Sequence, residues 1–303
     1  MKKHKLFFLL LVCFFYSCAT NPRFNPGEEE GNEFSLLPDG GLLYLWVDPD
    51  DGRPLIEHLF FENDIDRDTQ NILSRTRSIT AVLFSENENE TENENERSYY
   101  LAAFGNYPRS MANMSFTFSR AWRTQRSGTG NRYWYSRSSE LSLALGKNVA
   151  LVSDYDPFFA PLTGAEGQSA VIVPSDFTNF KQGHALAAWL RDPGEFIDTF
   201  FEEMGLPIRL PAEAIFIGIT RLPESLWEIS IHIKTPSERD ARTLQAGFNI
   251  AMLFLRRAQD IDFGNPIIAD LFFANPLEQD REFLVFRSPE MDLERVALLF
   301  GLF

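Results

Sequence analysis

The sequence predicts an α+β protein built from two related halves, each of the ferredoxin-like type, which pack together as one body. Strand-like runs with period-two alternation occur in both halves of the 303-residue chain, and helical segments separate them in the same order. Short stretches of the first half also resemble stretches of the second, which indicates an internal duplication. We therefore expect each half to repeat the same series of helices and strands.

Residues 1–17 have the pattern of a secretory signal peptide. Three lysines precede the apolar run 6–16, which is too short to cross a bilayer because a spanning helix needs about 20 residues. Ser17 followed by Cys18 resembles a bacterial lipoprotein processing site, so we expect cleavage before Cys18 and lipid attachment to that residue. The alternative is an ordinary signal peptide that is cut elsewhere and leaves a free thiol.

The mature chain is strongly acidic. Removal of residues 1–17 takes three of the 28 basic residues and none of the 43 acidic ones, which leaves a formal net charge of −18. This charge disfavours nucleic acid as a partner and direct adhesion to anionic lipid head groups. Because Cys13 is removed and Cys18 carries the lipid, we expect no disulfide, no thiolate zinc site and no cysteine nucleophile.

Two segments have low-complexity composition. Residues 18–38 are rich in Asn, Pro, Gly and Glu without an apolar period, and we expect them to form a flexible tether behind the lipid. Residues 85–96 alternate Glu and Asn between two strand-like runs, which predicts a long solvated hairpin loop. This tract lacks the glycine turn and the fixed ligand spacing that a calcium-binding loop needs.

The two predicted α+β repeats cover residues 39–156 and 185–303, and residues 157–184 form the linker between them. The first repeat is expected to contain an extended segment at 45–47, a helix at 54–60 and strands at 79–84, 99–104 and 133–137. The second repeat is expected to contain matching elements at 188–190, 196–201, 214–220, 227–234 and 284–288. A second helix is expected after Pro108 in the first repeat and after Pro236 in the second.

Two of the strands show clear alternation of apolar and polar residues. Ile229, Ile231 and Ile233 alternate with charged or polar side chains, and three leucines alternate with Ser142 and Ala144 in the run 141–145. Such alternation predicts strands with one buried face and one face in water.

Three amphipathic segments carry the leading functional hypothesis, namely 194–204, 266–275 and 293–303. Each gathers large apolar side chains, many of them Phe, on one stripe. Such stripes are either core faces of packed helices or surfaces that engage lipid or a bilayer, and the second interpretation is the hypothesis. The residues predicted to contact lipid or membrane are Phe196, Ile197, Phe200, Phe201, Met204, Ile268, Leu271, Phe272, Phe273, Leu299, Phe300 and Phe303.

The processing site, the acidic mature chain and the Phe-rich helices together resemble treponemal envelope lipoproteins. The site is relaxed, because Phe15 stands where Leu is common. Within that group the chain is similar to the outer-membrane-associated type that is thought to insert amphipathic helices into the bilayer. The resemblance implies a lipid-anchored envelope protein at the outer membrane, facing the periplasm, with the membrane, a bound lipid or an envelope protein as partner.

No catalytic motif occurs in the chain. It lacks G-x-S-x-G, H-E-x-x-H, the phosphate-binding loop and the dinucleotide fingerprint. His58, His184 and His232 have no second histidine at metal-ligand spacing, so they are predicted to be surface or packing residues. Short aspartate pairs beside Pro49 and Pro157 are predicted to form turns. We therefore expect a non-enzymatic protein with no cofactor and no metal site.

The alternative function is an envelope scaffold, or a lipoprotein that binds a partner or glycan through residues 120–137. This segment is the one basic, aromatic region of the chain, and Trp, Tyr and Arg dominate interface hot spots. The predicted contact residues are Trp122, Arg123, Arg132, Tyr133, Trp134 and Arg137. The competing interpretation is a strand pair with its aromatic side chains inward and its arginines outward.

Overall fold

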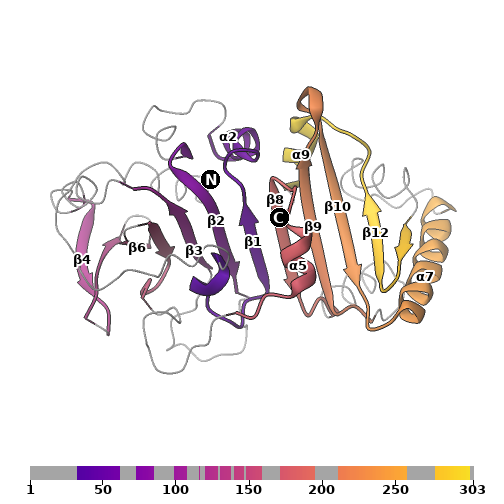
Figure 1. The fold of residues 1–303 in the computed structure, drawn as a ribbon, viewed down its shortest axis with the longest axis horizontal. Helices are drawn as coiled ribbons and strands as arrows, with labels where there is room; N and C mark the ends of the chain where they lie inside the picture. The colour runs from indigo at the N-terminus through magenta and orange to yellow at the C-terminus, as the bar shows by residue number, and fades with distance from the viewer. Residues whose placement is uncertain are drawn as a thin grey trace. The chain divides into compact units, whose positions relative to one another are not determined.

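The computed structural model describes residues 33–61, 73–84, 99–107, 116, 120–128, 130–137, 140–146, 148–158, 171–194, 211–257 and 277–300. The chain divides into two compact units, unit 1 (Met1–Pro174) and unit 2 (Ser175–Phe303). This boundary falls inside the predicted linker 157–184. The predicted signal peptide and Cys18 lie outside the described residues. Antiparallel strands dominate both units, and helices are fewer (Figure 1).

Unit 1 is a meandering antiparallel sheet. Its described elements are η1 (Glu33–Leu36), β1 (Leu43–Val47), α2 (Arg53–Phe61), β2 (Thr76–Leu83), β3 (Tyr99–Gly105), β4 (Trp122–Arg126), β5 (Arg132–Ser136), β6 (Leu141–Leu145) and β7 (Val149–Ser153). The strand order is β1-β2-β3-β7-β6-β5-β4, and each neighbouring pair is antiparallel. The sequence predicted the elements at β1, α2, β2, β3, β5 and β6, but it did not predict β7.

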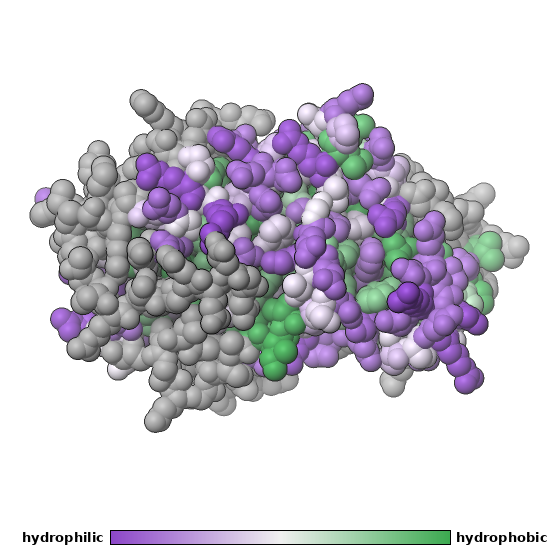
Figure 2. All heavy atoms as spheres, viewed as in Figure 1, coloured by the Kyte–Doolittle hydropathy of each residue, from purple (hydrophilic) through white to green (hydrophobic). Residues whose placement is uncertain are grey.

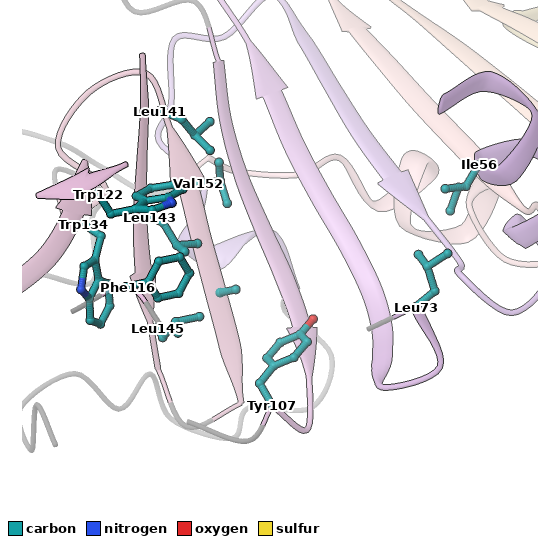
Figure 3. Close-up of a cluster of buried hydrophobic side chains, with 11 residues drawn as sticks. Ile56, Leu73, Tyr107, Phe116, Trp122, Trp134, Leu141, Leu143, Leu145 and Val152 are labelled. Atoms are coloured by element: carbon teal, nitrogen blue, oxygen red, sulfur yellow. The ribbon is translucent and has the colours of Figure 1, made fainter. Parts of the chain in front are cut away.

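The core of unit 1 gathers aromatic side chains from β4 and β5 over the leucines of β6 (Figure 3). The ring of Phe116 lies 5.1 Å from the ring of Trp122 and 5.1 Å from the ring of Trp134, centroid to centroid. All five residues of β6 are buried, Ser142 included, so the predicted wet face of this strand is wrong. In the register of the sheet, Ser142 lies opposite Ser153 of β7, which is also fully buried.

The start of unit 1 lies inside the segment predicted to be a tether. Phe34, Leu36 and Leu37 are almost completely buried. The indole Nε1 of Trp46 donates a hydrogen bond to the carboxylate of Glu33 at 2.7 Å, and this contact ties η1 to β1. The tether therefore cannot extend to residue 38, because buried apolar side chains hold the chain against the folded unit from residue 33 onward.

Unit 2 is a second antiparallel sheet with helices. Its described elements are α5 (Ser175–Phe180), β8 (Leu186–Arg191), β9 (Ala214–Arg221), η3 (Pro223–Ser225), β10 (Trp227–Lys234), α7 (Glu238–Arg257), β11 (Glu278–Asp280), β12 (Phe283–Arg287) and α9 (Leu293–Phe300). The strand order is β8-β9-β10-β12-β11, again with antiparallel neighbours. The helix expected after Pro236 is present as α7, whereas α5 lies in the predicted linker and was not expected.

Helix α5 packs against β9 through aromatic side chains. Phe177 is fully buried, and its ring lies 5.6 Å from that of Phe216 and 6.1 Å from that of Trp189. An ion pair of 2.6 Å between Asp176 and the Nζ of Lys234 adds a polar contact between α5 and β10. The predicted wet face of β10 is therefore partly covered, since Ser230 on that face is 2% exposed.

The ferredoxin-like duplication is not confirmed. A ferredoxin-like unit contains a split βαβ motif with parallel strands, but every described strand pair is antiparallel and β1 pairs with β2 across α2. Both units begin with a three-stranded antiparallel meander, β1-β2-β3 and β8-β9-β10, and then diverge in strand number and order. The packing of the two halves as one body stays a prediction.

Candidate functional site

Helix α7 begins at a strong start signal. The Oγ of Ser237 accepts a hydrogen bond from the backbone N–H of Asp240 at 3.2 Å and donates one to the Asp240 carboxylate at 2.6 Å. Glu238 and Asp240 place negative charge in the first turn, where the helix dipole favours it. This cap fixes the start of the helix.

The first half of α7 is anchored on the sheet. Ala241 and Leu244 are buried against the side chains of β9, β10 and β12, and Phe248 packs on the same cluster. The Nε2 of Gln245 donates a hydrogen bond of 2.7 Å to the carbonyl of Leu277. One stripe of the helix therefore belongs to the core of unit 2.

The second half of α7 carries apolar side chains outside that stripe. Ile250 is 53% exposed and Leu253 is 58% exposed. With 3.6 residues per turn, these two positions lie about 160° and 140° around the helix from Phe248. Figure 2 shows hydrophilic colour over the outward side of the first turns of α7 and hydrophobic colour at the border beside its last turns. The run 250–255 is apolar around the whole helix, a pattern typical of a helix that something covers on all sides.

Helix α9 repeats this arrangement on a smaller scale. The carboxylate of Asp292 caps it by accepting a hydrogen bond from the N–H of Arg295 at 2.8 Å. Val296 is buried, whereas Leu298 is 56% exposed. Leu299 and Phe300, which were predicted to contact lipid, lie in the last turn of α9, and the structure describes their backbone only.

The other residues predicted to contact lipid or membrane lie outside the described residues. These are Phe196, Ile197, Phe200, Phe201, Met204, Ile268, Leu271, Phe272, Phe273 and Phe303. Their role stays a prediction.

The alternative site at residues 120–137 forms the β4–β5 hairpin. Trp122, Tyr133 and Trp134 are 7%, 7% and 4% exposed, so the aromatic side chains point into unit 1. Arg123 and Arg137 are exposed, and Arg132 is partly buried. Aromatic and arginine side chains are not separated by face, because Arg132 projects to the same face of the hairpin as the buried Trp134. The aromatic half of the predicted contact surface is buried and not available to a partner.

The described histidines of unit 2 form a cluster that the sequence did not predict. The ring of Phe180 stacks on His184 at 4.5 Å and meets His232 edge-on at 4.8 Å, centroid to centroid. The Nε2 of His184 and the Oγ of Ser230 lie 3.2 Å apart. Both histidines therefore act as packing residues between α5 and the sheet. The sequence analysis predicted them to be surface or packing residues.

Gly218 of β9 makes this packing possible. A Cβ atom at residue 218 would lie 2.2 Å from Cδ2 of His184 and 2.9 Å from the ring of Phe180. Only glycine leaves room for both rings to rest on the strand.

Burial makes both histidines weak bases. It lowers the pKa of His184, and together with the positive Arg287 and the neighbouring His184 it lowers the pKa of His232 to about 4. Asp280 acts in the opposite direction on His232. The folded protein therefore holds these rings neutral at pH values where free histidine is already protonated.

Acidification is expected to destabilise unit 2 through His232. Because the unfolded chain binds a proton near pH 6.5 and the folded chain only near pH 4, stability is full above pH 6.5 and is lost as the pH falls toward 4. The loss between pH 7.5 and pH 5 is expected to be about 1 kcal/mol after allowance for the partly exposed ring. Urea unfolding at the two pH values measures it. His232→Gln is the matched control, and an equal loss in that variant would contradict the assignment to His232.

A metal site and a membrane-spanning helix were also considered for the described residues. Within these ranges, no three His, Cys, Asp or Glu side chains come together as a metal site would require. No helix in the same part of the chain is long and apolar enough to cross a membrane.

Sequence reasoning missed two features of the site. The first is the exposed pair Ile250 and Leu253 on α7. The sequence signal for it was the unbroken apolar run 250–255, which is followed by two arginines. Arg126 and Arg132 lie directly opposite each other across the hairpin, and the turn glycines Gly128 and Gly130 were the signal that sets this register.

Comparisons with known proteins agree with the lipoprotein interpretation. A family model described as "TP0453: Outer membrane-associated lipoprotein TP0453" matches residues 28–210, which is more than half of the chain. No curated protein sequence matches the chain.

Several crystal structures of TP0453 share the fold. Crystal form III matches with a TM-score of 0.58 and 14% sequence identity, over 91% of this chain and 100% of that one. Crystal form IV gives 0.56 and 14% identity, over 90% and 97%, and crystal form I gives 0.54 and 14% identity, over 91% and 98%. The family match confirms the resemblance and the predicted envelope location: the chain belongs to the family of outer membrane-associated lipoproteins to which TP0453 gives its name.

Proposed function

We propose that this lipoprotein engages the lipid of the membrane to which it is anchored through amphipathic helices, without catalytic activity, on the periplasmic side of the outer membrane. The observation that carries the proposal is the second half of α7, where Ile250 and Leu253 are more than half exposed on a helix whose first half is fixed in the core. Exposed Leu298 on α9 supports it.

Energetics favour lipid as the cover for these side chains. Full transfer of a Leu or Ile side chain from water to an apolar phase contributes about 1.5–3 kcal/mol. The lipid anchor predicted at Cys18 would hold the helix close to the bilayer, so that a modest intrinsic affinity suffices because the effective concentration is high. The acidic first turn of α7 lies at the opposite end of the helix from Ile250 and Leu253, so it does not have to enter the bilayer.

The double variant Ile250→Ser/Leu253→Ser is expected to weaken binding to neutral phosphatidylcholine vesicles by about 30-fold, because it removes about 2 kcal/mol of apolar transfer energy. Vesicle flotation of the mature chain made without lipid through Cys18→Ser measures the binding. Its free energy of unfolding is expected to change by less than about 0.5 kcal/mol, since both side chains are exposed.

Ile172→Ser/Leu42→Ser is the matched control. It removes two apolar side chains of unit 1 that are 87% and 41% exposed. Equal losses in both variants would indicate unspecific adhesion, and unchanged binding of the α7 variant would remove α7 from the proposal. A companion variant with Phe200, Phe201, Phe272 and Phe273 changed to Ser tests the other predicted helices in the same assay.

A further inference from the structure

We infer that the tip of the β4–β5 hairpin is a binding site for a phosphate group, formed by the facing side chains of Arg126 and Arg132. Residues directly opposite each other in an antiparallel pair project to the same face of the sheet. Arg126 pairs with Arg132 in the register of β4 and β5, so the two arginine side chains leave the hairpin on the same face from directly opposite positions.

Two like charges in this position destabilise a sheet unless an anion lies between them. Among the described residues, neither Arg126 nor Arg132 forms an ion pair. The only hydrogen bond of Arg132 in this part of the chain runs from Nη2 to the neutral Oγ1 of Thr124, at 3.0 Å. No described acidic side chain of unit 1 therefore pairs with either arginine.

Arg132 has an unused hydrogen-bond donor. Its Nε is buried and has no hydrogen-bond partner. Buried donors without an acceptor are costly, and an anion is the kind of ligand that supplies acceptors.

The carboxylate of Asp156 reaches the hairpin turn. It accepts backbone hydrogen bonds from Phe158, at 2.9 Å, and from Gly128. Burial and Asp156 together raise the pKa of Tyr133, which projects to the other face of β5, and Asp156 also contributes to the raised pKa of Tyr100. Among the described residues, Asp156 forms no ion pair with either arginine.

Phosphate is the anion that fits best. Guanidinium groups bind phosphate oxygens through paired hydrogen bonds, and two of them can hold one group from both sides. The mature chain carries a net charge of about −18, but charges beyond about 8 Å are largely screened at physiological salt. A local basic site can thus act within an acidic protein. The phosphate is supplied either by a phospholipid head group or by a soluble ion.

Arg126→Gln/Arg132→Gln in the mature Cys18→Ser chain tests the site, and Arg123→Gln/Arg137→Gln is its control. The control removes the same charge from exposed positions that do not face each other. One arm measures flotation with vesicles of equal parts phosphatidylcholine and phosphatidylglycerol, relative to phosphatidylcholine alone. The other arm titrates inorganic phosphate by calorimetry. Unfolding curves verify that both variants fold.

In the site variant, the ratio of affinities for anionic and neutral vesicles, or the affinity for inorganic phosphate, is expected to fall by about 30-fold. In the control variant the same quantity is expected to fall by about threefold or less. Loss in the vesicle arm identifies a lipid head group as the source, and loss in the calorimetric arm alone identifies a soluble phosphate. An equal loss in both variants, or no loss in either arm, overturns the site. The α7 proposal is tested by Ile250→Ser/Leu253→Ser in neutral phosphatidylcholine vesicles. There choline offsets the charge of each head-group phosphate, and the arginine pair gains no attraction to a net negative surface, so the two results are separable.

Discussion

Phe177→Ala is expected to lower the free energy of unfolding of unit 2 by about 3–5 kcal/mol, the range for removal of a buried aromatic side chain. The side chain is fully buried and its ring packs against those of Trp189 and Phe216. Phe180 of the same six-residue helix packs on Phe216 and on the two histidines, and loss of the Phe177 ring is expected to loosen these contacts as well. Denaturant unfolding followed by tryptophan fluorescence measures the loss, because Trp189 lies 6.1 Å from the ring that is removed.

Asn179→Ala on the same helix is the control. This side chain is exposed, and alanine is the better helix former, so the free energy of unfolding is expected to change by less than about 0.5 kcal/mol. A loss below about 1 kcal/mol in Phe177→Ala would show that α5 does not depend on this ring for its position on the sheet.

The sequence predicted individual elements better than their arrangement. Alternation identified β6 and β10, and Pro236 identified the start of α7. Partners of a strand depend on contacts between residues far apart in the chain, which no local period reports. The ferredoxin-like prediction failed at this step, because the order of helices and strands does not determine whether β1 pairs with β2 or with a later strand.

Burial was predicted least well where both faces of a strand are covered. The alternation of Leu and Ser in 141–145 is typical of a strand with one wet face, yet Ser142 is 2% exposed because small polar residues fit between neighbouring strands. The same limit applies to α5: the segment Ser175–Phe180 is too short to show a helical period, and its aromatic residues became informative only beside Phe216.

The candidate surfaces show a similar division. Composition located the arginines of residues 120–137, but it could not tell which side chains share a face of the hairpin. That depends on the register, which places Trp134 opposite Thr124 and Arg126 opposite Arg132 on one face. The exposed half of α7 was missed because amphipathic period was sought, whereas the run 250–255 is apolar on every side.

Trp134→Ala is expected to cost about 3–5 kcal/mol of the free energy of unfolding of unit 1, comparable to the loss at Phe177. The indole is 4% exposed, and its ring lies 5.1 Å from that of Phe116, which also contacts Trp122 (Figure 3). Removing it opens a cavity between β5 and the aromatic cluster. Denaturant unfolding measures this loss, and Arg137→Gln, which changes an exposed side chain, is expected to leave stability unchanged.

The size of this loss decides how partner-capture experiments on the hairpin should be interpreted. A residue that contacts a partner from the surface would lose capture on mutation and keep its stability, whereas a core residue loses stability first. Trp134→Phe separates the two, because it keeps most of the contact with Phe116 and removes an indole N–H that has no partner in the fold, so its loss is expected to stay below about 2 kcal/mol. If Trp134→Ala instead unfolds at the same denaturant concentration as the unmodified chain, the ring does not support the core. Trp134 would then again be a candidate for contact with a partner.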